Sequence, residues 1–221
     1  MTRSVAPFSI VLLALPVLAA GPDIVVAPDT SAGGYVDSRI SSSANPPYRY
    51  PTAGQRLHQF VHDTLSPEAA LNAAFGAGIK QAYGTPPEWG GGIDGYGSRI
   101  ADSWGRIFIS SAIEQTTGAL LGEDTRYFRC DCSGVLPRTK HALISTFIAR
   151  TPSGGKTIAF ARLAGDYGSS MIGTYWYPAR FDPLKDGFRS GNYAVLGDAG
   201  WNLTHEFWPD VKRKLFHKSS D

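Results

Sequence analysis

Apolar residues recur every three or four positions along most of the chain after residue 51, which is the pattern of amphipathic helices. Leu57, Phe60, Val61 and Leu65 predict the first helix. Because this spacing gathers apolar side chains on one face, we expect that face to be buried. The same pattern predicts further helices over residues 67–83, 94–121, 137–149, 157–176, 191–207 and 210–218.

Capping residues mark the ends of several of these helices. Ser66 followed by Pro67 combines a capping hydroxyl with a proline at the first helical position. Gly122 and Pro178 are residues at which a helix ends. A β-barrel, which needs many alternating segments of about ten residues, is the second choice because only short stretches alternate. The sequence therefore predicts an all-α fold, a single-domain bundle of five to six helices.

Small residues fall four positions apart on three of the expected helices. Glycine inside a helix costs about 0.5–1 kcal/mol relative to alanine, so several of them imply a compensating contact. We expect these Gly/Ala ridges to let neighbouring helices approach closely. The three ridges are Ala70, Ala74, Gly78 and Ala82; Gly97, Ala101 and Gly105; and Ala161, Gly165, Ser169 and Gly173.

The first 51 residues differ from the rest. Arg3, an apolar run over 8–18 and small residues up to Ala19 have the form of a cleaved signal peptide, 1–19. The run is shorter than the roughly 20 residues that cross a bilayer, so a membrane anchor is the less favoured reading. Residues 20–51 are rich in Pro, Ser and Gly and predict a flexible lead-in. Residues 52–221 form the bundle domain, ending in a short basic helix.

Composition and charge narrow the possible functions. The net charge is +2 and 43% of residues are apolar, so the chain can bury a core but lacks the concentrated basic surface of a nucleic-acid binder. We expect no nucleic-acid partner. Charged residues such as Arg99, Asp102 and Asp166 interrupt the best helices, which argues against membrane-spanning segments.

The two cysteines, Cys130 and Cys132, are separated by one residue. With no other thiol and scattered histidines, a structural zinc site is incomplete. Export favours oxidation, so we expect a local disulfide between them. No metal and no cofactor is predicted, and no nucleophile elbow, His-Glu-x-x-His motif or phosphate-binding loop is present.

Two groups of polar residues could carry chemistry. One is a stripe on the last long helix, formed by Asp198, Asn202 and Glu206 with His205 beside it. This stripe could bind a hard cation or orient a water molecule, or it could equally be a solvated face. The other is Arg162 and Asp166, which are spaced i, i+4 beside the small-residue ridge at Gly165. Glu114 and His141 could join them in a buried polar network. The candidate catalytic residues are Asp166, His141, Glu114 and His205. The candidate ligand-binding residues are Asp198, Asn202, Glu206 and Arg162.

These features favour an exported cell-envelope protein, either a non-enzymatic scaffold or a membrane-associated interaction module. The expected partner is a membrane surface or an envelope protein, and the expected location is the periplasm, the outer envelope or the extracellular space. Whether the protein is an enzyme stays open. The alternatives are a hydrolase or metal-dependent enzyme that uses the acidic and histidine residues, and a carrier of lipid or a small apolar ligand.

Overall fold

The computed structural model describes residues 48–216 and is mostly helical, which confirms the predicted class. The expected signal peptide and most of the expected lead-in lie outside these residues. The helices are α1 (Ala53–Leu65), α2 (Pro67–Ala82), the 3-10 helix η1 (Pro87–Trp89), α3 (Ile93–Leu121), α4 (Val135–Ser145), α5 (Phe160–Thr174) and α6 (Lys185–Phe216).

Local signals in the sequence set several helix ends. The Thr52 hydroxyl accepts a hydrogen bond from the Gln55 backbone N–H at 3.3 Å, and the Gln55 side chain accepts from the Thr52 N–H at 2.9 Å. Together they form a capping box at the start of α1. Ser66 caps α2 by accepting from the Ala69 N–H at 3.1 Å. Gly122 ends α3 in the left-handed conformation, with φ 70°.

The structure contains a short hairpin that the periodicity did not predict. Strands β1 (Ile148–Arg150) and β2 (Lys156–Ile158) pair antiparallel, with Ala149 opposite Thr157. The helix expected over 137–149 therefore stops at Ser145, and the helix expected from residue 157 begins at Phe160. Three-residue strands are too short for an alternating pattern to identify.

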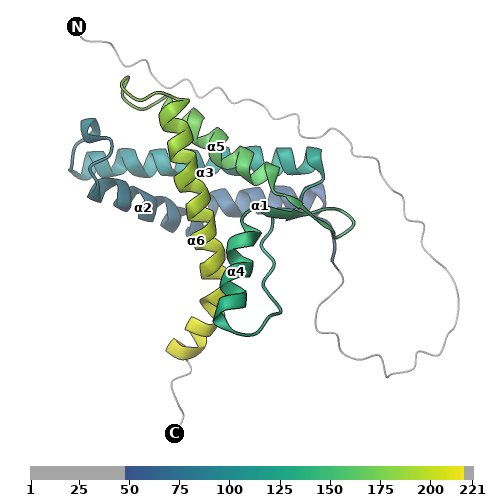
Figure 1. Ribbon diagram of the computed structural model, residues 1–221. Coiled ribbons are helices and arrows are strands. Elements are labelled where there is room, and N and C mark those ends of the chain that lie inside the picture. Colours follow the sequence, from purple (N-terminus) through teal and green to yellow (C-terminus); the bar gives the residue numbers. More distant parts are fainter. Residues whose placement is uncertain (1–47, 217–221) are drawn as a thin grey trace, which may run out of the picture. The chain divides into compact units, whose positions relative to one another are not determined.

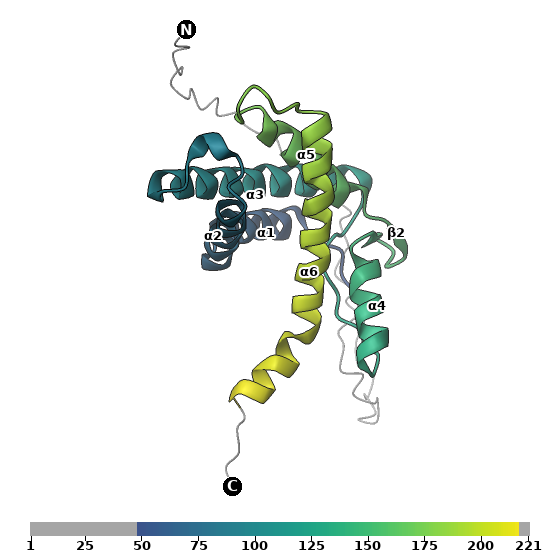
Figure 2. The ribbon, with the colours of Figure 1, turned by 60° about the vertical axis from the view of Figure 1, so that its left-hand side comes forward.

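Helix α3 lies between α1 and α2 on one side and α5 on the other (Figure 1). Helix α6 packs against α5 with its first part and against α4 with its later part. The helix break expected at Pro209 is absent: α6 continues through this residue to Phe216. Figure 2 shows α6 bending in its C-terminal part, where the proline removes one backbone hydrogen bond.

The apolar faces that periodicity assigned to the core point outward. On α1, Leu57 is 64% exposed and Leu65 is 67% exposed, whereas Arg56 and Thr64 are buried. Periodicity therefore predicted this helix correctly and its buried face wrongly. The charged and hydroxyl-bearing side is the one that packs against the neighbouring helices.

Helix α4 and the residues after it repeat this arrangement. Leu143, Ile144 and Phe147 are large apolar residues of the helix expected over 137–149, and each is about half exposed. Ala142 and Thr146 are buried instead. The buried side of the segment consists of small and polar side chains.

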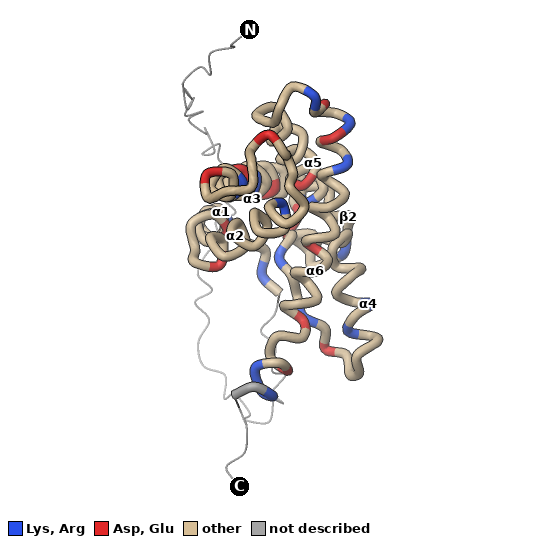
Figure 3. Tube along the Cα trace, turned by 90° about the vertical axis from the view of Figure 1, so that its left-hand side faces the viewer, with Lys and Arg blue, Asp and Glu red and all other residues tan. Residues whose placement is uncertain are grey.

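The interior of the described residues combines alanines with charged groups. Ala73 and Ala77 on α2 are fully buried, and so is Arg99 on α3. Asp102 is only 3% exposed. In Figure 3 the tubes of α1 and α2 carry few charged residues.

The three expected small-residue ridges differ in how closely they are packed. A Cβ added at Gly165 on α5 would lie 2.8 Å from the Ser110 carbonyl oxygen on α3, so these helices approach closely there. At Gly78 and Gly97, no atom lies within 4 Å of such a Cβ. The expected ridges on α2 and α3 are therefore open at these glycines. On α2 the buried stripe lies one residue earlier, at Ala69, Ala73 and Ala77.

Candidate functional site

Four of the candidate residues come together where α3, α5 and α6 meet. The guanidinium Nε of Arg162 lies 4.0 Å from Glu114 Oε1 and 3.7 Å from Asp198 Oδ2. Asp166 follows Arg162 by one turn of α5 and is 5% exposed. We call Glu114, Asp166 and Asp198, with Arg162, the carboxyl cluster. It brings three acidic groups from three helices around one cation.

Hydrogen bonds to backbone oxygens fix the Arg162 side chain. Its Nη1 donates to the Ser145 carbonyl at 2.7 Å and to the Thr146 carbonyl at 2.9 Å, and its Nη2 donates to the Thr125 carbonyl. Both terminal nitrogens of the guanidinium are thus engaged away from the carboxylates. Arg162 therefore offsets the negative charge of the cluster only in part.

Asp166 is the most perturbed group of the cluster. Its Oδ2 is buried without a hydrogen-bond partner in the described part of the chain. Burial, followed by the charges of Asp198 and Glu114, raises the pKa of Asp166 to about 9, although Arg162 acts in the opposite direction. The side chain is therefore a neutral carboxylic acid at pH 7.

Two other carboxyl groups are perturbed in the same direction. Burial and the charge of Glu114 raise the pKa of Asp198 to about 6, even though its side chain remains partly exposed. Burial and the same Glu114 raise the pKa of Asp63, on α1, to about 6. Asp63 was not a candidate, because no spacing in the sequence links it to α3. The cluster can hold protons at neutral and mildly acidic pH.

The described residues contain no group of three or more His, Cys, Asp or Glu side chains arranged to hold a metal ion. The candidate histidines lie apart from the carboxyl cluster. His141 Nε2 is 2.8 Å from the Phe128 carbonyl oxygen, and the His205 ring packs edge-on against Trp201 with centroids 4.8 Å apart. The expected network of acids with His141 is therefore not formed.

The polar stripe of α6 is divided between two environments. Asn202 donates to Thr146 Oγ1 at 3.1 Å in the interior. Glu206, 1% exposed, accepts from the Tyr127 hydroxyl at 2.6 Å, from the Cys130 backbone N–H at 3.1 Å and from Arg138 Nε at 2.7 Å. Asn202 and Glu206 therefore face α4 and the segments on either side of it, whereas Asp198 faces Arg162 of α5, so the stripe is not a fully solvated face.

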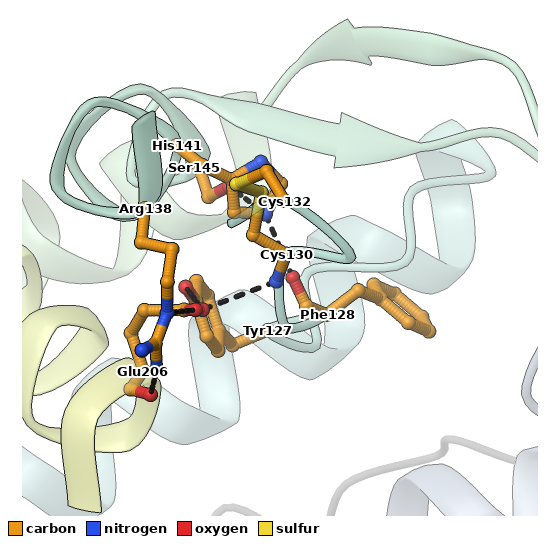
Figure 4. Close-up of a disulfide and its surroundings, with 8 residues drawn as sticks. All are labelled: Tyr127, Phe128, Cys130, Cys132, Arg138, His141, Ser145 and Glu206. Atoms are coloured by element: carbon orange, nitrogen blue, oxygen red, sulfur yellow. Dashed lines mark hydrogen bonds and ion pairs between the residues drawn. A yellow bond between two sulfur atoms is a disulfide. The ribbon is translucent and has the colours of Figure 1, made fainter. Parts of the chain in front are cut away.

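Glu206 fastens the loop that carries the disulfide (Figure 4). Cys130 and Cys132 form a disulfide in that loop. Burial alone would raise the pKa of Glu206, but hydrogen bonds from Arg138 and Tyr127 hold it below its usual value. A carboxylate saturated by these donors has a structural role.

A second buried carboxylate is Asp102 on α3, which was not among the candidate site residues. It accepts from Lys80 Nζ at 2.5 Å, Arg106 Nε at 2.8 Å, Trp176 Nε1 at 2.8 Å and the Tyr177 hydroxyl at 2.8 Å. These donors come from α2, α3 and the segment after α5. Asp102 and Arg106 lie four residues apart on α3, a spacing at which oppositely charged side chains of one helix meet, and both side chains are largely buried.

The exterior of the helices is unusually apolar. The largely exposed residues of α1 and α5, of α2 after Glu68 and of α3 after Asp94 include no Lys, Arg, Asp or Glu, although 41% of the Asp63 side chain is exposed. The same holds on α6 between Arg189 and Lys212, where 38% of the Asp198 side chain is exposed. We call the exposed large side chains of these stretches the apolar exterior. They include Leu57, Val61, Leu65, Leu71, Phe75, Ile79, Trp104, Phe108, Ile172, Tyr193, Leu196, Trp201 and Trp208.

Within residues 48–216, no helix combines the length and the hydrophobicity needed to cross a membrane. Comparison with protein-family models, with curated proteins and with solved structures finds no match for this chain.

Proposed function

We propose that the protein is an exported, membrane-associated interaction module of the cell envelope. The observation that carries the proposal is the combination of an apolar exterior with a charged interior. A water-soluble domain normally has the opposite arrangement, because charged groups are costly to bury and contiguous apolar patches are rarely left exposed.

The free energies involved favour a nonpolar environment for the apolar exterior. Full burial of one Leu or Phe side chain is worth about 1.5–3 kcal/mol, and Phe75 alone is 73% exposed. Contact with lipid acyl chains recovers this energy for residues on several helices at once. Inside lipid-facing bundles, ionisable residues turn inward and pair with one another, as Asp102 does with Lys80 and Arg106.

Other features agree with this proposal. The ridge of Ala161, Gly165, Ser169 and Gly173 is buried on α5, and small residues are typical of helix contacts in lipid. The exposed Trp201 and Trp208 suit a membrane interface, where amphipathic rings are favoured. Export depends on the signal-like residues 1–19, and a disulfide between Cys130 and Cys132 is compatible with an oxidising compartment.

The proposal is tested by flotation of the purified chain with vesicles of phosphatidylcholine. We expect the wild-type protein to float with the vesicles, and the double variant Phe75→Ser, Ile79→Ser to bind at least about tenfold more weakly, because it removes two large apolar contacts. Asn72→Ser changes an exposed polar residue on the same helix and should leave binding unchanged.

Circular dichroism establishes that the variants keep their helical content. Complete retention of the wild-type protein in the buffer fraction would refute the proposal. So would equal losses of binding in the double variant and in Asn72→Ser. If the protein instead forms a defined oligomer that does not bind vesicles, other protein chains cover the apolar exterior and the membrane assignment is wrong.

A further inference from the structure

Basic residues gather at one end of α6, directly after the stretch whose largely exposed residues are uncharged. Lys212, Arg213 and Lys214 are all exposed there. Arg138 reaches the same region from α4. Figure 3 shows blue segments near the C-terminal end of the described part of α6. The stretch of α6 whose largely exposed residues are uncharged thus ends at a basic edge.

A shallow pocket lies at this edge, between the start of α4 and the last turns of α6. Its volume is about 480 Å³. Its walls are partly apolar and partly basic, so one ligand could make both apolar and cationic contacts there. The lining residues are Val135, Arg138, Phe207, Asp210, Val211, Arg213 and Lys214.

The carboxylate in the pocket is already occupied by arginines. Asp210 Oδ2 accepts from Arg138 Nη1 at 2.5 Å, and its Oδ1 accepts from Arg213 Nη2. These hydrogen bonds hold the pKa of Asp210 below its usual value, so the group stays ionised and keeps both arginines in place. Arg138 is also bonded to Glu206, which leaves little of its charge free.

The two lysines beside these arginines are different. No acidic side chain of the described residues pairs with Lys212 or Lys214. Lys212 Nζ lies 5.4 Å from the centroid of the Trp208 ring, an arrangement that places a cation next to an interfacial aromatic side chain. Among the described residues, four cations therefore meet two carboxylates at this edge, and the uncompensated charge is positive.

Exposed apolar side chains lie in the pocket and beside it. Val135 and Leu136 at the start of α4 are largely exposed, and Trp208 and Val211 on α6 are about half exposed. Apolar contact next to Lys and Arg is the composition of surfaces that lie at the boundary between acyl chains and headgroups. A soluble anion would use the cations but would leave these apolar side chains in water.

We propose that this basic edge binds the phosphate of anionic phospholipid headgroups, while the apolar exterior next to it contacts the acyl chains. The inference rests on the proposed membrane association and adds the class of lipid and the end of the molecule that recognises it. Lys212 and Lys214 supply the free positive charge. Arg138 and Arg213, ordered by Asp210, form the wall of the pocket.

The test compares vesicles of phosphatidylcholine alone with vesicles that also contain phosphatidylglycerol. We expect the wild-type chain to bind the anionic vesicles more tightly, with a preference that decreases as salt is added. Lys212→Gln, Lys214→Gln should lower binding to anionic vesicles by up to about thirtyfold at low salt and leave binding to neutral vesicles unchanged.

The matched control is Lys185→Gln, Arg189→Gln, which removes two exposed cations from the other end of α6, where Asp182 and Asp186 lie close by. Its affinity for anionic vesicles should stay close to that of the wild-type chain. Equal losses in the two double variants would mean that net charge acts without a site, and would overturn the inference.

Further outcomes separate this inference from the proposed function. If the wild-type chain binds neutral and anionic vesicles equally well, headgroup recognition is refuted and membrane association stands. If it binds neither, both proposals fail. If inorganic phosphate at low millimolar concentration abolishes the preference for anionic vesicles, the edge is a site for free phosphate and the lipid assignment is wrong.

Discussion

Replacing Asp166 by Asn should remove much of the pH dependence of stability above neutral pH. Folding raises the pKa of this carboxyl group from 3.8 to about 9. The folded chain therefore keeps a proton that the unfolded chain has already released over most of this range. Because the folded state binds the extra proton, stability falls as pH rises from the lower value to the higher one.

The slope can be worked out from the structure. One extra proton in the folded state costs at most about 1.4 kcal/mol of unfolding free energy per pH unit. The pKa values of Asp198 and Asp63 are raised only to about 6, so these groups contribute little above neutral pH. Between about pH 7 and about pH 8.5, Asp166 should therefore account for a loss of up to about 2 kcal/mol.

Urea unfolding at several pH values in this interval measures the effect. The free energy of unfolding of the wild-type chain should fall as pH rises. That of Asp166→Asn should change little with pH and should exceed the wild-type value at the upper end of the pH interval. Asp94→Asn, a change to an exposed carboxylate at the start of α3, should keep the wild-type slope. Parallel curves for the wild-type and Asp166→Asn chains would show that Asp166 does not hold the proton.

Further predictions concern helix packing and the buried ion pairs, and each is measured by the midpoint of denaturant unfolding. Gly165→Ala should destabilise the protein by about 1–3 kcal/mol, because the new Cβ would meet backbone on α3 at 2.8 Å. Gly97→Ala enters open space on a helix and should stabilise by about 0.5–1 kcal/mol; equal effects at the two glycines would contradict the close approach. Asp102→Ala should cost about 3 kcal/mol or more, since it leaves two cations without their partner; a change below about 0.5 kcal/mol would show that the pairs contribute nothing.

The existence of most helices and the ends of α2 and α3 could be predicted from the sequence, because these depend on local chemistry. The Ser66 and Pro67 signal and the stop at Gly122 appear in the structure where the pattern places them. The hairpin was missed because its strands are three residues long. The break expected at Pro209 is absent because contacts with α4, such as that of Glu206 with Arg138, stabilise α6 on both sides of the proline.

Which side of each helix is buried could not be predicted in the same way. The rule that the apolar stripe of a helix faces the core presumes a protein surrounded by water. On α1 that rule selected Leu57 and Leu65, whereas the buried residues are Arg56 and Thr64. Periodicity identifies two sides of a helix, and the surroundings decide which of them faces inward.

The candidate site was predicted in part for a related reason. Arg162 and Asp166 were singled out as an i, i+4 pair next to a small-residue ridge, and the structure brings Glu114 and Asp198 to them. The two histidines were grouped with these acids only by residue type, and nothing in their spacing fixed their position. Contacts between helices far apart in the sequence decided the grouping.

The charged interior has a consequence for how the gene can vary. Positions such as Leu71 and Phe75 face outward, so exchange among Leu, Ile, Val and Phe there alters no internal contact. Arg99 donates hydrogen bonds to three backbone carbonyls and to Gln81, so even lysine is a poor replacement for it. Across descendants of this gene, the exposed apolar residues should be exchanged for one another often, while the buried arginines and aspartates stay unchanged. A protein with a hydrophobic core accumulates the reverse pattern of substitutions.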